Sequence, residues 1–214
     1  MSGYGFTFRD EALEARASGV LWWPAARVLA VGDLHFGKAQ RGALRGGGLL
    51  PPYDMRETLA RLDAEIAALD PAIVVALGDS FDDPEAEARL LEADAVWLAR
   101  LMAGREWLWI AGNHDPGPVA MGGSLLAQWD HRGLAFRHVA QGVGEISAHY
   151  HPKARLAGVA RPCFLLDGDR VILPAFGAYT GGLDCRRDPL AGLMGPGALA
   201  VLTGTRARVL PMPR

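Results

Sequence analysis

The sequence predicts an α/β fold in which two mixed β-sheets are flanked by helices, organised as one domain over residues 1–214. Two patterns in the sequence lead to this prediction. In roughly the first 130 residues, short apolar runs alternate with amphipathic stretches, as strands followed by helices do. Beyond that point the helical periodicity ends, and short apolar runs separated by Gly, Pro and Asp indicate further strands. The chain has 214 residues, 50% of them apolar, and is long enough to bury a sizeable core.

The first strand and helix are predicted by a buried apolar run and a capping signal. Residues 28–31 form an apolar run that ends at Gly32. Asp54 begins a helix, because Glu57 three residues later completes a pair resembling a capping box. Apolar residues then recur at helical spacing, at Leu59, Leu62, Ile66 and Leu69. Pro71 ends this helix.

The next elements follow the same order. Residues 73–77 predict a buried strand, and a second helix is expected from about Pro84, a residue favoured in the first turn. Its inner face is expected to carry Leu90, Leu91, Val96, Leu98 and Leu101. Residues 107–110 form a third strand before Gly112. Later strands are expected near 134–139, 145–149, 163–167, 170–174, 198–202 and 206–210.

Composition excludes several classes of protein. No apolar run approaches the roughly 18 residues that a membrane helix needs, and the N-terminus lacks the pattern of a secretory signal. Cys163 and Cys185 are too few for a disulfide framework, so we expect free thiols and a cytoplasmic protein. The 22 basic and 24 acidic residues exclude a strongly basic nucleic-acid coat protein, although a local basic groove remains compatible with this balance.

Polar residues of metal-ligand type follow each of the first three predicted strands. The three segments are Gly32-Asp33-Leu34-His35, Gly78-Asp79-Ser80-Phe81-Asp82 and Gly112-Asn113-His114-Asp115. In open α/β sheets, ligands bind beyond the carboxyl ends of the strands. We therefore expect these three loops to converge on one site.

Two further histidine signals strengthen this expectation. His149 and His151 form an i, i+2 pair at the end of a predicted strand, which points both rings the same way, and His138 lies on the strand before it. Taken singly, each signal has an ordinary explanation: a turn, a helix cap, a core histidine or a surface pair. Together they favour a site for two divalent ions held by carboxylate, amide and imidazole groups.

This ordered set resembles the calcineurin-like metallophosphoesterase superfamily. The superfamily pattern runs Asp-x-His, Gly-Asp-x-x-Asp or His, Gly-Asn-His-Asp or Glu, a lone His, and Gly-His-x-His. Five of the six histidines fall on this pattern, and only His131 is left over. Ala148 stands where the superfamily usually carries Gly, and because Ala is small we expect little consequence.

A narrower resemblance covers most of the chain. Five segments look like those of the ligase-associated DNA damage response metallophosphoesterases: residues 33–38 (DLHFGK), 50–54 (LPPYD), 78–81 (GDSF), 149–152 (HYHP) and 173–182 (LPAFGAYTGG). The resemblance implies a nuclease or phosphodiesterase that acts on DNA beside a DNA ligase and a helicase. Two alternatives stay open: a hydrolase of a small phosphoester or nucleotide, and a non-catalytic scaffold of the same fold.

The resemblance also implies roles for individual residues. One metal ion would be held by Asp33, His35 and His151, the other by Asn113, His138 and His149, and Asp79 would bridge the two. Mn is the expected metal, with Fe, Zn and Mg as alternatives. His114 would protonate the leaving oxygen. Three residues are candidate substrate contacts, each with an ordinary surface or turn role as the alternative: Lys38, Arg155 and Tyr179.

Asp82 departs from the narrower family, whose nuclease-type members commonly carry His at this place. A carboxylate here would accept a hydrogen bond from the His114 ring and favour its protonated form, so we assign Asp82 a catalytic role. The alternative is that Asp82, or the neighbouring Asp83, only caps the helix expected near Pro84.

Overall fold

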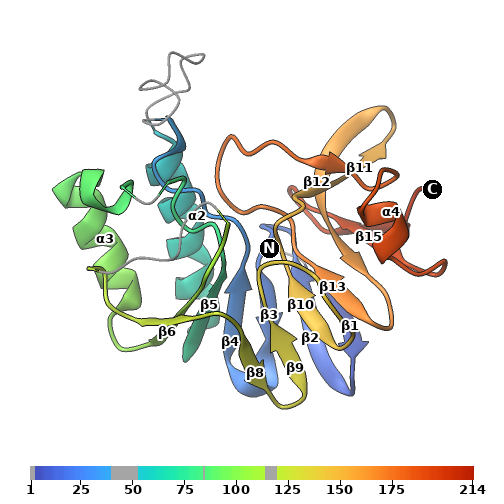
Figure 1. The fold of residues 1–214 in the computed structure, drawn as a ribbon, viewed down its shortest axis with the longest axis horizontal. Coiled ribbons are helices and arrows are strands. Elements are labelled where there is room, and N and C mark those ends of the chain that lie inside the picture. The colour runs from blue at the N-terminus through green and yellow to red at the C-terminus, as the bar shows by residue number, and fades with distance from the viewer. Residues whose placement is uncertain (1–2, 40–52, 84, 114–119) are drawn as a thin grey trace.

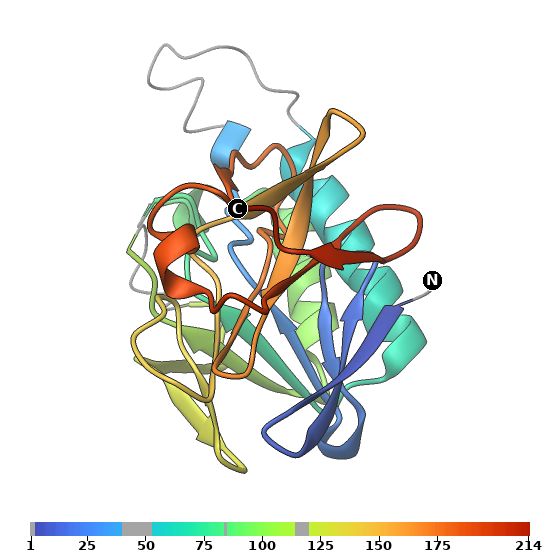
Figure 2. The same cartoon turned by 90° about the vertical axis from the view of Figure 1, so that its right-hand side faces the viewer.

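A computed structural model of the chain describes residues 3–39, 53–83, 85–113 and 120–214. Two mixed β-sheets pack against each other with helices on their outer faces (Figure 1, Figure 2), which confirms the predicted fold class. The first sheet has seven strands in chain order: β1 (Gly3–Phe8), β2 (Glu11–Arg16), β3 (Leu21–Trp23), β4 (Val28–Val31), β5 (Ile73–Leu77), β6 (Glu106–Ile110) and β7 (Ser124–Leu126). From β4 to β7 neighbouring strands are parallel, so their carboxyl ends lie at one edge.

The second sheet has nine strands and is built from the later part of the chain. They are β8 (Trp129–His131), β9 (Leu134–Phe136), β10 (Glu145–Ser147), β11 (Pro152–Leu156), β12 (Val159–Leu166), β13 (Arg170–Ile172), β14 (Leu183–Asp184), β15 (Leu199–Leu202) and β16 (Arg208–Pro211). The strand β10 lies between β9 and β13 and is parallel to both. The strand β12 pairs antiparallel with β11, β13 and β15.

Successive side chains of a strand point to opposite faces of its sheet, so each strand contacts a different layer on each face. In β4, Val28 and Ala30 pack with apolar residues of the second sheet, whereas Leu29 and Val31 pack with the helices. Those helices are α2 (Asp54–Leu69) and α3 (Glu92–Met102), which cover the outer face of the first sheet (Figure 1). The short α4 (Leu190–Leu193) packs on the outer face of the second sheet. None of the helices that the structure describes is long and apolar enough to cross a membrane.

The second helix begins later than the sequence predicts. A 3₁₀ turn, η2 (Glu87–Arg89), precedes α3, and Leu91 adopts an extended conformation just before the helix starts. The expected inner face is therefore wrong at two positions: Leu91 is 54% exposed and Val96 63% exposed. In the separate turn before the helix, the Asp83 carboxylate accepts a hydrogen bond from the Glu85 amide and pairs with Arg89.

The strands β1, β2 and β3 form an antiparallel meander over residues 3–23, ahead of the first strand predicted from the sequence. The outer strand β1 is mostly exposed, so it lacks the continuous apolar run of a buried strand. Both cysteines are buried and free, as expected, and burial raises the pKa of each thiol.

A buried ion pair joins this meander to the helix α2. The Arg16 guanidinium contacts the fully buried carboxylate of Glu65, and its Nη1 also lies 3.0 Å from Oε1 of the half-buried Glu14. A carboxylate that is removed from water depends on its partner, because an unpaired buried charge is far more costly than the pair. Glu65 therefore couples the helix to the sheet.

Glu65→Ala should lower the free energy of unfolding by about 3–5 kcal/mol, because it leaves the buried Arg16 charge without its main partner. Glu14→Ala, which removes the less buried partner of the same arginine, should cost about 1 kcal/mol or less. Denaturant unfolding of both variants measures the difference. An equal loss of unfolding free energy in the two variants would show that burial of the Arg16–Glu65 pair contributes nothing to stability.

Candidate dinuclear metal centre

Three loops meet at the carboxyl ends of β4, β5 and β6. Backbone hydrogen bonds join the first two loops: the amides of His35 and Phe36 donate to the carbonyls of Asp79 and Ser80, each at 2.9 Å. The third loop packs so closely that a Cβ on Gly112 would lie 2.2 Å from the backbone nitrogen of Asp79 and from its Oδ1. A glycine is thus required there, and the loops form one layer beneath the site.

The second sheet supplies the opposite side of the site. His138 follows β9, and His149 and His151 follow β10. The His149 amide donates to both carboxylate oxygens of Asp33, at 3.0 and 3.2 Å, which ties the two sheets together at this point. Ala148 lies directly against the first loop, since a Cβ on Gly32 would come within 2.5 Å of the Ala148 Cβ. The methyl group of Ala148 fits because Gly32 has none.

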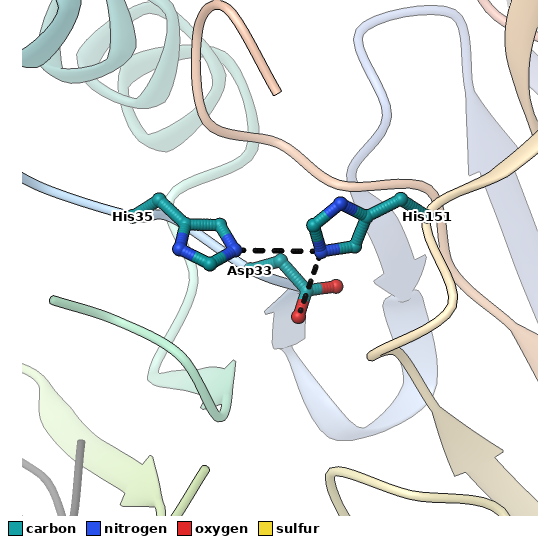
Figure 3. A group of neighbouring side chains, drawn as sticks. All are labelled: Asp33, His35 and His151. Carbon is teal, nitrogen blue, oxygen red and sulfur yellow. Dashed lines mark hydrogen bonds and ion pairs between the residues drawn. The ribbon is translucent and has the colours of Figure 1, made fainter. Parts of the chain in front are cut away.

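The first group of side chains is Asp33, His35 and His151 (Figure 3). The Nε2 atoms of the two histidines lie 3.4 Å apart, and His151 Nε2 lies 3.4 Å from Asp33 Oδ1. These ligand atoms all lie within 4.8 Å of one another, which is close enough for one metal ion to reach all three.

The second group is Asp79, His138 and His149. His138 Nε2 lies 3.4 Å from Asp79 Oδ2 and 3.1 Å from His149 Nδ1. The amide oxygen of Asn113 lies 2.8 Å from the same His138 nitrogen, so Asn113 adjoins this group. His138 Nδ1 lies 3.8 Å from Asp33 Oδ1, which places the two groups side by side.

Two rings are oriented by groups behind them. The Nδ1 atom of His138 lies 2.8 Å from the Leu77 carbonyl, to which it donates a hydrogen bond. The Nδ1 atom of His35 lies 3.0 Å from Asp82 Oδ1, which is an ion-pair distance without the geometry of a hydrogen bond, and both side chains are buried. A proton held on Nδ1 leaves the Nε2 lone pair directed into the group, which is the tautomer that metal binding needs.

The chemistry of the donors fits a pair of divalent cations. Asp33 and Asp79 are buried, and the ion-pair partners of Asp33 within the described residues are the histidines His138 and His151. Buried carboxylates require a compensating cation. Carboxylate, imidazole and amide ligands together suit Mn, Fe or Zn.

Burial and neighbouring charges shift the pKa values of the two histidines in the second group. Burial disfavours the charged form of His138, but Asp79 and Asp33 outweigh it and raise the pKa of His138 above its ordinary value. Burial and the neighbouring His138 ring lower the pKa of His149. The neutral form of His149, which can bind a metal, is therefore favoured near neutral pH.

Most of these residues have a strained backbone. Five of the seven expected ligands have a φ between 46° and 67°, in the left-handed region that side chains other than glycine rarely adopt: Asp33, His35, Asp79, His149 and His151. Strain of this kind is typical of functional sites, where the surrounding contacts must hold it in place.

The other predicted site residues lie around this centre or outside the described residues. Lys38 follows the first loop, Arg155 lies on β11, and Tyr179 is exposed beyond Gly177. His114, and residues 50–52 of the family-like segment, lie outside the described residues, so a contact of His114 with Asp82 stays a prediction. The contact of Asp82 with His35 has no counterpart in the sequence prediction, because no spacing rule indicates which ring a carboxylate will face.

Comparisons with known proteins agree with this geometry. The sequence profile of the family described as calcineurin-like phosphoesterase matches residues 26–170. The crystal structure of Pseudomonas putida nuclease MPE is similar to this chain, with a TM-score of 0.77 and 28% sequence identity, covering 98% of this chain and 100% of that one. A comparison with curated proteins found no match. The protein is a metal-dependent phosphoesterase, and the chain belongs to the calcineurin-like phosphoesterase family.

Proposed function

We propose that this protein is a nuclease that uses two divalent metal ions to hydrolyse phosphodiester bonds in DNA. The observation that carries the proposal is the pair of ligand groups side by side at the ends of β4, β5 and β6. The similarity to a solved nuclease over nearly the full length of both chains supports nucleic acid as the substrate. Family resemblance supports a role beside a DNA ligase and a helicase, and the two free cysteines support the expected cytoplasmic location.

In this proposal each ligand group holds one ion. Asp33, His35 and His151 hold the first, and His138, His149 and Asn113 hold the second. Asp79 bridges them. Two such ions supply a water nucleophile at neutral pH and neutralise charge on the phosphoryl oxygens. Mn is the expected metal, with Fe, Zn and Mg as alternatives.

The remaining residues act on the substrate. His114 would donate a proton to the leaving oxygen, as its place beside the ligand Asn113 favours. Lys38 and Arg155 are proposed to contact the substrate because each follows a ligand closely in the chain, Lys38 after His35 and Arg155 after His151. Tyr179 is proposed because it is exposed and follows Gly177, whose amide donates to the Asp33 carbonyl. Arg155 in particular lies four residues after His151 on β11.

The function is tested by an activity panel on the purified protein with Mn, Mg, Zn or Fe. The substrates are bis(p-nitrophenyl) phosphate, p-nitrophenyl phosphate, single-stranded DNA, duplex DNA and RNA. We expect DNA cleavage and a preference for the diester over the monoester, both abolished by a chelator and best restored by Mn. Asp79→Asn, which alters the bridging ligand, should reduce both activities more than about 100-fold. Hydrolysis of the monoester alone, with DNA intact, would instead indicate a small-molecule phosphatase.

Asp82 is proposed to position His35 for metal binding through the contact between Asp82 Oδ1 and His35 Nδ1. Asp82→Ala should weaken metal affinity roughly 10–100-fold, and Asp82→Asn, which keeps an acceptor oxygen, should recover part of the loss. Metal content after dialysis and the Mn dependence of the unfolding midpoint measure this effect.

The matched control for this prediction is Asp83→Ala. It removes the adjacent carboxylate, which pairs with Arg89 and not with a ligand, and should leave metal affinity unchanged. If Asp82→Ala retains its metal and loses turnover, the residue acts elsewhere, as in the predicted contact with His114.

A further inference from the structure

The charge of the chain is unevenly distributed. Residues 151–214 carry nine basic and four acidic residues, a net charge of +5, whereas residues 1–150 carry 13 basic and 20 acidic residues, a net charge of −7. The positive segment begins directly after the last predicted metal ligand, His151. It contains the strands β11 to β16, which form one side of the second sheet (Figure 2).

Several arginines of this segment have no carboxylate within ion-pair distance among the described residues. Elsewhere most described arginines form ion pairs, among them Arg9, Arg27 and Arg100. Four of the arginines without an ion pair are exposed and belong to strands or turns of the second sheet: Arg155, Arg161, Arg206 and Arg208. Exposed guanidinium groups of this kind leave their positive potential available to a ligand.

These four arginines lie on two neighbouring hairpins. The β11–β12 hairpin carries Arg155 and Arg161, and its β12 half is exposed over residues 159–162. The β15–β16 hairpin carries Arg206 in its turn and Arg208 on β16. The strand β12 joins the two hairpins, because Cys163 pairs with Leu202 of β15.

A groove of about 460 Å³ lies between Leu156, at the end of β11, and the β15–β16 hairpin, from which it is lined by Arg206, Ala207, Arg208, Val209 and Leu210. Arg161 reaches the far hairpin, since its Nη1 lies 3.0 Å from the position that a Cβ on Gly204 would occupy. We name the surface formed by Arg155, Arg161, Arg206 and Arg208 the arginine groove; Arg206 and Arg208 line the cavity, and Arg155 and Arg161 lie on the adjoining hairpin. Within the described part of the chain no aromatic ring lines it, so it offers contacts to phosphates and not stacking to bases.

The arginine groove is connected to the metal centre by the strand β11. That strand starts at Pro152, immediately after His151, and runs outward to Leu156 (Figure 1). Arg155 is four residues beyond His151, roughly 13 Å away at the usual rise of a strand. One strand of duplex DNA carries a phosphate about every 3.4 Å along the helix axis, so this distance spans about four nucleotides.

We propose that the arginine groove binds the phosphate backbone of the nucleic-acid substrate, several nucleotides away from the bond that is cut. This inference rests on the proposed nuclease function and specifies where the substrate lies. Arginine suits the task because its planar guanidinium group binds phosphate oxygens in pairs. Contacts to phosphates alone position the substrate without reading its sequence.

The test replaces three of the four arginines. Arg155 is left in place, because it donates a hydrogen bond to the Gly158 carbonyl in the hairpin turn. The triple variant is Arg161→Gln, Arg206→Gln and Arg208→Gln. The matched control is Arg9→Gln, Arg27→Gln and Arg100→Gln, which changes net charge equally at exposed arginines that have carboxylate partners. Metal content and unfolding midpoints establish that both proteins are folded.

Two quantities are measured, each in the parent, the triple variant and the control. The ratio of kcat/KM on DNA to kcat/KM on bis(p-nitrophenyl) phosphate should fall at least about tenfold in the triple variant only. The slope of log affinity against log salt should become shallower by roughly 0.9 for each phosphate of duplex DNA that the variant no longer binds. A third variant, with Lys at the same three positions, should keep most of the salt dependence of DNA binding, because it keeps the three positive charges.

The outcomes separate this inference from the function on which it rests. If the parent cuts DNA and the triple variant matches the control in ratio and slope, the arginine groove is not the substrate path. If the parent hydrolyses the small diester but leaves DNA intact, the nuclease function itself is wrong.

Discussion

The site depends on the burial of two carboxylates, Asp33 and Asp79, at the ends of adjacent parallel strands. Neither can be moved into water without separating the loops, because Gly112 packs on the backbone of Asp79 and the His149 amide is bonded to Asp33. The negative charge of these buried carboxylates attracts cations. Without a bound cation, the buried charge destabilises the folded protein. The histidines, their hydrogen-bond partners and the glycine turns all serve to keep these two groups in place.

The two sheets contribute different halves of the centre. The first supplies Asp33, His35, Asp79 and Asn113, and the second supplies His138, His149 and His151. The apolar layer between the sheets, which includes Val75, Phe136 and Ile146, therefore determines the distance between the two sets of ligands. A change of packing far from any ligand would be felt as a change in metal affinity, because protein interiors transmit strain.

Much of this arrangement is encoded locally and could be predicted. Strands β4 and β5 are continuous apolar runs, and the motif spacing placed the histidines among the carboxylates. What could not be predicted depends on tertiary contacts. Glu65 lies among the apolar residues of α2. Its presence there is explained by Arg16 of the β1–β3 meander, which it contacts. Asp83 pairs with Arg89 in the turn before α3, and the arginine groove joins residues about 50 positions apart in the sequence.

The left-handed backbone at five ligands has a consequence for the stability of the fold. Each non-glycine residue in that conformation costs roughly 1–2 kcal/mol, a local cost that the bonds between Asp33 and the His149 amide help to offset. A substitution that relieves this local strain would remove a side chain from the site, so at these positions stability and the ligand set oppose each other. The strained backbone therefore marks the positions where the chain keeps a polar side chain at a cost to its own stability.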